Sequence, residues 1–394
     1  MIEVWIILLA IAVAVAFIAE KINQPYPTLL VIAGLTVGML PIPILDEMKN
    51  RVTNDVFFQT AIITIFLSAL LGEATLKLPF KELKENNKPI IFLSILGTLL
   101  TFLFVSTASF YLLHLSIQES LVFGAVMSAT DPISVLTIFK SMKLNKRLSI
   151  IVEGESLGND GVAVVLFKIS LVTTALSSAG VMHASLEFLK VVIGGIIVGA
   201  VFGFLASRIT RHIDQHLIEI GLSIVLFYGS FELAEHFHVS GVISVGVAGL
   251  IFGNYGKKIG MSEQTLRHMD AFWEAIAFLA NTLIFFMVGL EVMRIGLEGN
   301  WGLVLGSIAI VVLSRMAAVF LSLSFDKSVP FTWKTAIAWG GLKGSLSIAL
   351  IISITPHFQG KDLLLAMTFA NVLFSLLVQG TTIKFLVKIF RIYI

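Results

Sequence analysis

Two aspartates and two basic residues fall inside long apolar stretches of this 394-residue sequence: Asp131, Asp160, Arg315 and Lys343. An ionised group at the centre of a lipid bilayer costs at least about 2.5–3.5 kcal/mol, so such groups persist where they face a cavity or a partner. Carboxylates in that setting can bind a hard cation, and they can also take up a proton. The four residues therefore indicate either two structural ion pairs or a site that handles cations and protons.

Both Asp131 and Lys343 lie beside residues that interrupt a helix. Pro132 has no N–H, so the carbonyl group of Ser128 loses its helical partner. Three glycines within residues 340–344 weaken the helix around Lys343. Broken helices are tolerated in lipid where they line a cavity, and breaks in matching positions of two halves are typical of a transporter site. The sequence thus favours a transport site over two structural ion pairs.

Oxygen atoms from four nearby positions make up the predicted ion site, namely Asp131, Asp160, Ser156 and the backbone carbonyl of Thr130. Ser156 precedes Asp160 by one helical turn, so the two side chains share a face. Such a set of oxygens suits Na⁺ or a similar hard cation, and these midplane segments contain no histidine that would suggest a transition metal. A proton and a cation would compete for these oxygens, which is sufficient for coupled exchange.

The composition requires that these residues be positioned by membrane-spanning helices. The chain is 57% hydrophobic and 13% charged, whereas soluble proteins are about 45–50% apolar and about 25% charged. This excludes an ordinary cytosolic enzyme and a disordered chain, and the absence of cysteine excludes disulfides and Cys-type zinc sites. A net charge of +2 with no dense basic tract gives no sign of nucleic-acid binding. The lipid bilayer is the expected environment, and no soluble partner is evident.

Thirteen apolar runs have the length of a transmembrane helix, about 17–25 residues. Their expected ranges are 3–20, 26–42, 56–75, 89–113, 119–139, 148–170, 187–207, 216–235, 239–255, 270–290, 301–324, 332–354 and 363–386. Assigning the connections alternately to two sides puts 19 of the 27 Lys and Arg residues on one side and 6 on the other. By the positive-inside rule the rich side is cytoplasmic, which predicts an external N-terminus and a cytoplasmic C-terminus.

The spacing of the interrupted helices predicts an internal repeat. A shift of about 212 positions places the fifth span on the twelfth and the sixth on the thirteenth. Two six-helix halves separated by one span have opposite membrane orientations, so the repeat would be inverted. The expected fold is an all-α polytopic membrane protein of about 13 transmembrane helices, with two inverted six-helix repeats and broken helices five and twelve.

The motifs around these residues resemble one family of transporters over essentially the whole chain. They are Ser128–Pro132, Gly154–Gly161, Gly340–Gly344 and, more loosely, Phe286–Leu290. Together they are similar to the archaeal and bacterial sodium/proton antiporters of the first monovalent cation:proton antiporter family.

The resemblance implies an exchanger that forms a homodimer, needs no cofactor and lies in a prokaryotic plasma membrane. The whole chain, 1–394, would form one exchanger domain with two parts. A dimerisation part would cover approximately 1–75 and 187–290, and an ion-transporting core approximately 89–170 and 301–390. The Asn159-Asp160 pair resembles that of electroneutral members, which exchange one cation for one proton.

The resemblance also assigns roles to individual residues. Asp160 would be the main carrier, with Asp131, Ser156 and Thr130 as further ligands of the Na⁺. The supporting residues implied by the family are Asn159, Glu155, Lys343, Arg315 and Glu73. Glu155 and the base at position 343 would flank Asn159 and hold it, while Glu73 would support the ion site through water. Family members usually have arginine where this sequence has Lys343. The resemblance therefore does not fix the geometry of the contact among Glu155, Asn159 and Lys343.

Three other functions compete with Na⁺/H⁺ exchange. A K⁺/H⁺ antiporter of the same family has the same pattern, because ligand distances decide among Na⁺, Li⁺ and K⁺. A proton-coupled carrier of organic solutes also uses broken helices, but its site should contain more aromatic and amide groups. An intramembrane aspartyl protease needs two aspartates on adjacent helices, but residues 157–160 depart from its glycine-x-glycine-aspartate pattern.

Overall fold

The computed structural model describes residues 2–21, 26–39, 61–142, 144–173, 178–294, 301–355, 357–390 and 392. Within these ranges the chain is helical and contains no β-strand, as expected. Six helical segments are long and apolar enough to cross a membrane. They are Asn87–Leu112, Met182–Thr210, His216–His236, Glu263–Met287, Trp301–Phe325 and Lys361–Ile389.

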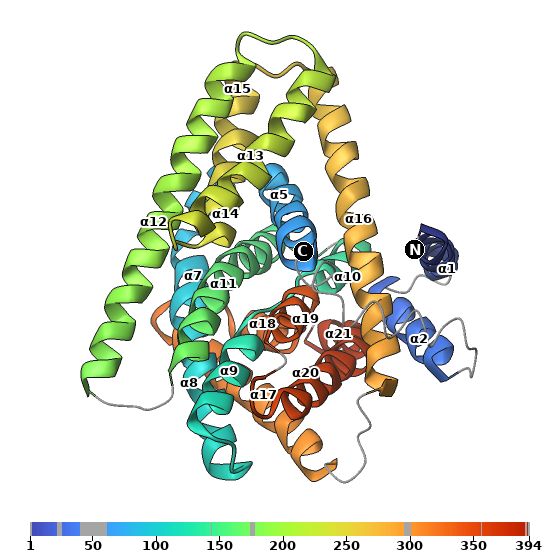
Figure 1. The fold of residues 1–394 in the computed structure, drawn as a ribbon, viewed down its shortest axis with the longest axis vertical. Coiled ribbons are helices and arrows are strands. Elements are labelled where there is room, and N and C mark those ends of the chain that lie inside the picture. The colour runs from blue at the N-terminus through green and yellow to red at the C-terminus, as the bar shows by residue number, and fades with distance from the viewer. Residues whose placement is uncertain are drawn as a thin grey trace.

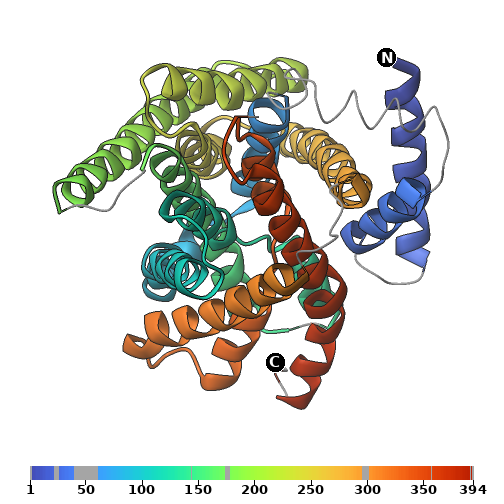
Figure 2. The ribbon, with the colours of Figure 1, turned by 60° about the horizontal axis from the view of Figure 1, so that its bottom comes forward.

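The helices pack into two groups. The first consists of α1 (Ile2–Lys21), α2 (Tyr26–Met39), η1 (Ala61–Phe66), α5 (Leu67–Lys77), α12 (Ser178–Thr210), α13 (His216–His236), α14 (Gly241–Ile251), η3 (Phe252–Gly256), α15 (Lys257–Ile259) and α16 (Glu263–Arg294). The long helices α12 and α16 form the two tilted edges of this group, and α5, α13 and α14 lie between them (Figure 1). Figure 2 shows α1 and α2 at the outer side of α16.

The second group consists of α6 (Phe80–Glu85), α7 (Asn87–Ile91), η2 (Phe92–Gly97), α8 (Thr98–Leu112), α9 (Ile117–Ser128), α10 (Ile133–Ser141), α11 (Lys146–Val172), α17 (Trp301–Ser322), η4 (Leu323–Phe325), α18 (Phe331–Trp339), α19 (Ser345–Ile352), α20 (Lys361–Phe374), η5 (Ser375–Gln379) and α21 (Gly380–Ile389). Figure 2 shows α12 and α13 on one side of α11, and α17 and α18 on the other. Helix α11 therefore lies where the two groups meet.

Each expected span overlaps helical segments in the described residues, although the fifth and twelfth also contain non-helical residues. Residues 40–42 and 56–60, at the ends of the second and third expected spans, lie outside the described residues. Helix α12 begins nine residues before the expected 187, and α16 begins seven residues before the expected 270. Polar residues at these ends stay helical, because a helix can continue beyond the apolar stretch that hydropathy detects.

Two of the predicted spans are interrupted. Residues 129–132 separate α9 from α10, and residues 340–344 separate α18 from α19. Pro132 lacks the N–H that would continue the first helix, and the glycines around Lys343 weaken the second. The two breaks touch each other, because the N–H of Asp131 donates to the carbonyl of Leu342 at 2.8 Å. This contact places the two interrupted segments at one point of the fold.

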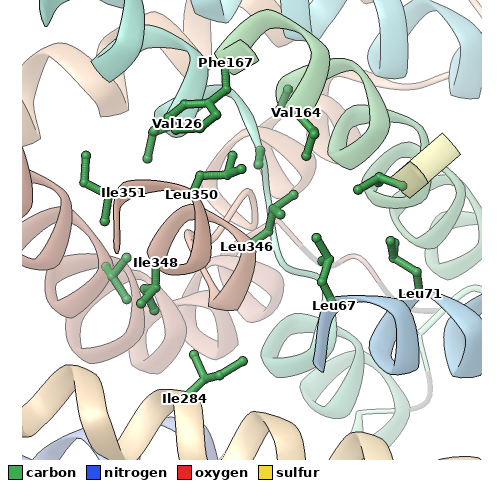
Figure 3. Packing of buried hydrophobic residues seen from close by; sticks show 14 of the residues in the cluster. Leu67, Leu71, Val126, Val164, Phe167, Ile284, Leu346, Ile348, Leu350 and Ile351 are labelled. Carbon is green, nitrogen blue, oxygen red and sulfur yellow. The ribbon is translucent and has the colours of Figure 1, made fainter. Parts of the chain in front are cut away.

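An apolar cluster lies next to these breaks. Near the breaks it includes side chains from α5, α9, α11, α16 and α19, as Figure 3 shows for Leu67, Val126, Phe167, Ile284 and Leu346. The cluster joins helices of both groups beside the breaks.

Candidate ion-binding site

A cavity of about 340 Å³ lies between the two groups of helices, beside the helix breaks. Five of the predicted site residues line it: Thr130 and Asp131 from the first break, Ser156 and Asp160 from α11, and Glu73 from α5. The other four predicted residues lie behind the cavity wall and are each at most 3% exposed, namely Asn159, Glu155, Lys343 and Arg315. The structure thus separates the nine residues into a lining set and a supporting set.

Ser156, Asn159 and Thr130 form one hydrogen-bonded unit. The Ser156 hydroxyl donates to the Thr130 carbonyl at 2.7 Å. The Asn159 side chain donates to the Thr130 hydroxyl at 2.6 Å and accepts from the Thr130 N–H at 3.3 Å. A carbonyl oxygen has two lone pairs, so the Thr130 carbonyl can still accept a second partner. These bonds fix the unwound residue Thr130 against α11, with its backbone at the cavity.

The two predicted carboxylates keep unused oxygens at the cavity. Asp131 Oδ1 accepts from the N–H of Ile133 at 2.9 Å. Asp131 Oδ2 and Asp160 Oδ1 are buried and have no hydrogen-bond donor among the described residues. A buried acceptor without a donor is costly, and a bound proton or cation removes that cost. The pair can therefore bind either one.

Lys343 caps the helix that leads into the first break. Its ammonium donates to the carbonyl of Met127 at 2.6 Å and to the carbonyl of Ala129 at 3.0 Å. Its own N–H donates to the Ser375 hydroxyl at 3.0 Å. The last carbonyls of a helix lack helical partners and carry partial negative charge, so a cation there is stabilising. The resemblance placed this residue beside Asn159, whereas the structure places its charged group on the end of α9.

Glu155 and Arg315 form a buried ion pair behind the cavity wall. Glu155 Oε1 lies 2.6 Å from Arg315 Nη2, and the side chains are 2% and 3% exposed. The same guanidinium reaches the carbonyl of Ile337 at 3.5 Å, at the end of α18. Asn159 is held by Thr130, and the partner of Glu155 is Arg315. Of the four charged residues singled out in the sequence, Arg315 thus belongs to a structural ion pair with Glu155, whereas Asp131 and Asp160 line the cavity.

Glu73 lies at the mouth of the cavity. Its Oε1 is 2.7 Å from Lys77 Nζ, which also lies 3.1 Å from Glu274 Oε2. Glu274 is 70% exposed, so this end of the cavity is open. Sequence reasoning missed Lys77 and Glu274, because both look like ordinary charges near helix ends.

Asn281 and Tyr26 also line the cavity and were missed. Asn281 comes from α16, is 2% exposed and has a side-chain oxygen without a donor among the described residues. Its signal in the sequence is an amide in the middle of the apolar run 270–290. Tyr26 comes from the first turn of α2 and gives no such signal.

The cavity has an open end and a closed end. Along α11, Glu153 lies nearest the mouth, Asp160 lies at the floor, and Val164 and Phe167 follow in the apolar cluster. Along α16, Glu274 is at the mouth and Ile284 is in the cluster. Figure 3 shows Leu67, Val164, Phe167 and Ile284 around Leu346 and Leu350 of α19. A small solute can therefore reach the aspartates from the mouth, and the described residues at the other end are apolar.

The fold and sequence resemble those of known antiporters. The chain is 51% identical over 386 residues to "Na(+)/H(+) antiporter NhaG" of Bacillus atrophaeus, covering 97% of this chain and 74% of the relative. It is 46% identical over 387 residues to "Na(+)/H(+) antiporter NhaH" of Halobacillus aidingensis, covering 97% and 96%. The solved structure of the sodium proton antiporter MjNhaP1 of Methanocaldococcus jannaschii matches with a TM-score of 0.81 at 23% identity, covering 98% of this chain and 97% of that one.

The match to a family model extends over nearly the entire chain. The model described as "Sodium/hydrogen exchanger, transmembrane" matches residues 6–389. This match and the two relatives above 45% identity together establish the family of the chain. The chain belongs to the sodium/hydrogen exchanger family.

Proposed function

We propose that this multi-pass membrane protein exchanges Na⁺, or Li⁺, for H⁺ as a secondary transporter and not as an enzyme. One observation carries the proposal: Asp131 Oδ2 and Asp160 Oδ1 are buried at a single cavity with no hydrogen-bond donor among the described residues. The relatives NhaG and NhaH, each named a Na⁺/H⁺ antiporter, support the same pair of substrates.

Competition at these oxygens couples the two ions. The Asp160 carboxyl group releases its proton to the open side, and the carboxylate then binds the cation. Asp131, the Ser156 hydroxyl and the Thr130 carbonyl supply further oxygens, which suit a hard cation. Asn159 stays neutral beside Asp160, so one cation replaces one proton and the exchange is electroneutral. Since protons occupy the same oxygens, the Na⁺ concentration for half-maximal rate rises as pH falls.

The supporting residues hold this arrangement without touching the ion. Asn159 fixes Thr130, and the Glu155–Arg315 pair ties α11 to α17. Lys343 fixes the end of α9. Glu73, held by Lys77 at the mouth, guides a hydrated cation toward the floor.

Access alternates between the two ends of the cavity. We place thirteen spans in the cell membrane, with the N-terminus outside, the C-terminus inside and the mouth beside Lys77 on the cytoplasmic side. The two interrupted helices belong to inverted six-helix repeats. The contact between Asp131 and Leu342 supports this arrangement, since it joins the breaks at matching places of the two halves.

The two groups of helices correspond to two functional parts. We assign the first group to the dimerisation part, approximately 1–75 and 187–290, and the second to the ion-transporting core, approximately 89–170 and 301–390; the contacts within each group support this division. Helix α12 has long apolar side chains exposed along its length, among them Ile193, Ile197 and Phe204, which suits burial against lipid or a second protomer. The protein is proposed to act as a homodimer.

Proton flux in proteoliposomes tests the function. An imposed pH gradient should collapse on addition of Na⁺ or Li⁺, and Asp160→Ala should abolish this response while the protein stays monodisperse. If neither cation collapses the gradient in the native protein, the exchange function is wrong. A response to K⁺ alone would assign the protein as a K⁺/H⁺ antiporter, and a rate that follows the membrane potential would contradict electroneutrality.

A further inference from the structure

The face of α11 beyond the cavity leads to a charged residue at the closed end. Lys168 lies eight residues after Asp160, which corresponds to about 12 Å along a helix. Val164 and Phe167, between them, belong to the apolar cluster and are 5% and 4% exposed. Lys168 therefore lies beyond Val164 and Phe167, which we call the plug, at the end of α11 away from the mouth.

Lys168 joins the two groups of helices. Its Nζ lies 2.7 Å and 2.6 Å from the two carboxylate oxygens of Glu235, near the end of α13. Glu235 Oε1 also accepts from the N–H of Gly241, at the start of α14, at 3.0 Å. The carboxylate is thus fixed by the first group of helices, and the ammonium belongs to the second group.

Helices α11 and α14 pack closely at the level of Asp160, about two helical turns from this ion pair. A Cβ at Gly161 would lie 2.7 Å from Cγ1 of Ile243, so only a glycine fits there without displacing that side chain. One helical turn toward the cavity, a Cβ at Gly246 would lie 3.7 Å from Leu157. These contacts would be lost if α11 moved away from α14.

We infer that Lys168 and Glu235 form a latch that holds the closed end of the cavity shut. The inference rests on the proposed exchange function, which requires access to alternate. For the cavity to open at its other end, α11 must separate from α14, and the ion pair must then break. Lys168 and Glu235 are positioning residues, since neither touches the transported ion.

The exposure of the pair sets the size of the expected effect. The side chains are 42% and 33% exposed, so water screens their attraction. An exposed ion pair of this kind changes an equilibrium about two- to fivefold. This is too little to determine whether the chain folds, but it is enough to shift the balance between two access states that differ only slightly in free energy.

Cysteine labelling tests the latch, because the chain has no cysteine of its own. Val164→Cys places one thiol in the plug, and a membrane-impermeant maleimide is added to proteoliposomes on the side that carries Lys168. In this background, Lys168→Met should raise the labelling rate about two- to fivefold, and Lys168→Arg should leave it unchanged. Glu235→Gln keeps an acceptor for the Gly241 N–H but loses the charge, so it should match Lys168→Met.

A control and two outcomes make the test decisive. Lys190→Met removes the ion pair with Glu187, which lies on the same helix α12, and should leave labelling unchanged. Equal labelling in Lys168→Met and the parent would overturn the latch, as would faster labelling in Lys168→Arg. The proposed function is tested separately. If the variants label as expected but the parent protein moves no protons with Na⁺ or Li⁺, the exchange function is wrong and the latch stands.

Discussion

Lys343 caps the end of α9, the helix that leads to Asp131. Asp131 in turn lies against the start of α19, the helix that follows Lys343. The Lys343 ammonium donates to the carbonyls of Met127 and Ala129 at the end of α9. The Asp131 carboxylate lies against Gly344, the N-cap of α19. Each charge has the sign that the helix end beside it favours, since N-termini attract anions and C-termini attract cations. The two broken helices thus stabilise each other.

Removal of the Lys343 charge should destabilise the site. Lys343→Met leaves two carbonyls at the end of α9 without their charged donor, at a cost of about 1.5–3 kcal/mol. Lys343→Arg keeps a cationic donor and should cost less, although its planar fork matches two separate carbonyls less well than an ammonium. Thermal unfolding in detergent should rank the parent first, Arg second and Met last. A Met variant as stable as the parent would show that the cap is dispensable.

A methyl group at Gly344 should displace Asp131. The φ angle of Gly344 is −137°, which any residue adopts, so the effect is steric and not conformational. A Cβ there would overlap Asp131 Oδ2. Gly344→Ala should raise the Na⁺ concentration for half-maximal exchange at least about tenfold, which corresponds to the loss of about 1.4 kcal/mol of binding. Gly302→Ala is the control, because nothing lies within 4 Å of its Cβ, and an altered cation affinity there would contradict the steric explanation.

Separation of the buried ion pair should cost more than its complete replacement. Arg315→Met leaves Glu155 charged and buried without its partner, which costs about 3–5 kcal/mol. Replacing both residues by methionine removes the uncompensated charge and should restore much of the stability. Melting temperatures of the single and double variants measure this difference. A double variant no more stable than Arg315→Met would mean that the pair contributes more than charge compensation.

Arg147 should matter more than its neighbour Lys146. Arg147 donates to Asn86 Oδ1 at 2.7 Å and to Ser328 Oγ at 2.7 Å, and its guanidinium lies 5.9 Å from the ring centroid of Trp333. Arg147→Ala should lower stability by about 1–3 kcal/mol. Lys146 is 76% exposed in its ion pair, so Lys146→Ala should stay within about 1 kcal/mol of the parent. Melting temperatures would contradict this expectation if the two variants lost equal stability.

The sequence alone predicts the features that depend on local chemistry. Apolar runs of sufficient length locate the helices, and Pro132 and the glycines around Lys343 locate the breaks. Helical spacing places Ser156 and Asp160 on one face, and both line the cavity. The motifs around these residues also identify the family, which the match over residues 6–389 confirms.

The remaining features depend on contacts between distant segments. The partners of Lys343 lie 214 and 216 residues away, and no local pattern indicates which carbonyls an ammonium will reach. Asn281 lines the cavity because α16 packs across it from the first group of helices, although one amide in an apolar run is common in buried helices. The number of spans and the inverted repeat stay predictions, because six helices satisfy the criteria of length and hydropathy in the described residues.

The exchange of caps between the two broken helices has a consequence for biogenesis. The first half of the chain reaches the membrane with the end of α9 still uncapped, since the ammonium that caps it lies more than 210 residues further along. Asp131 likewise has no α19 to face until the second half is inserted. The ion cavity is therefore a product of late assembly, and a fragment that stops before α18 contains every aspartate of the site without the means to position them.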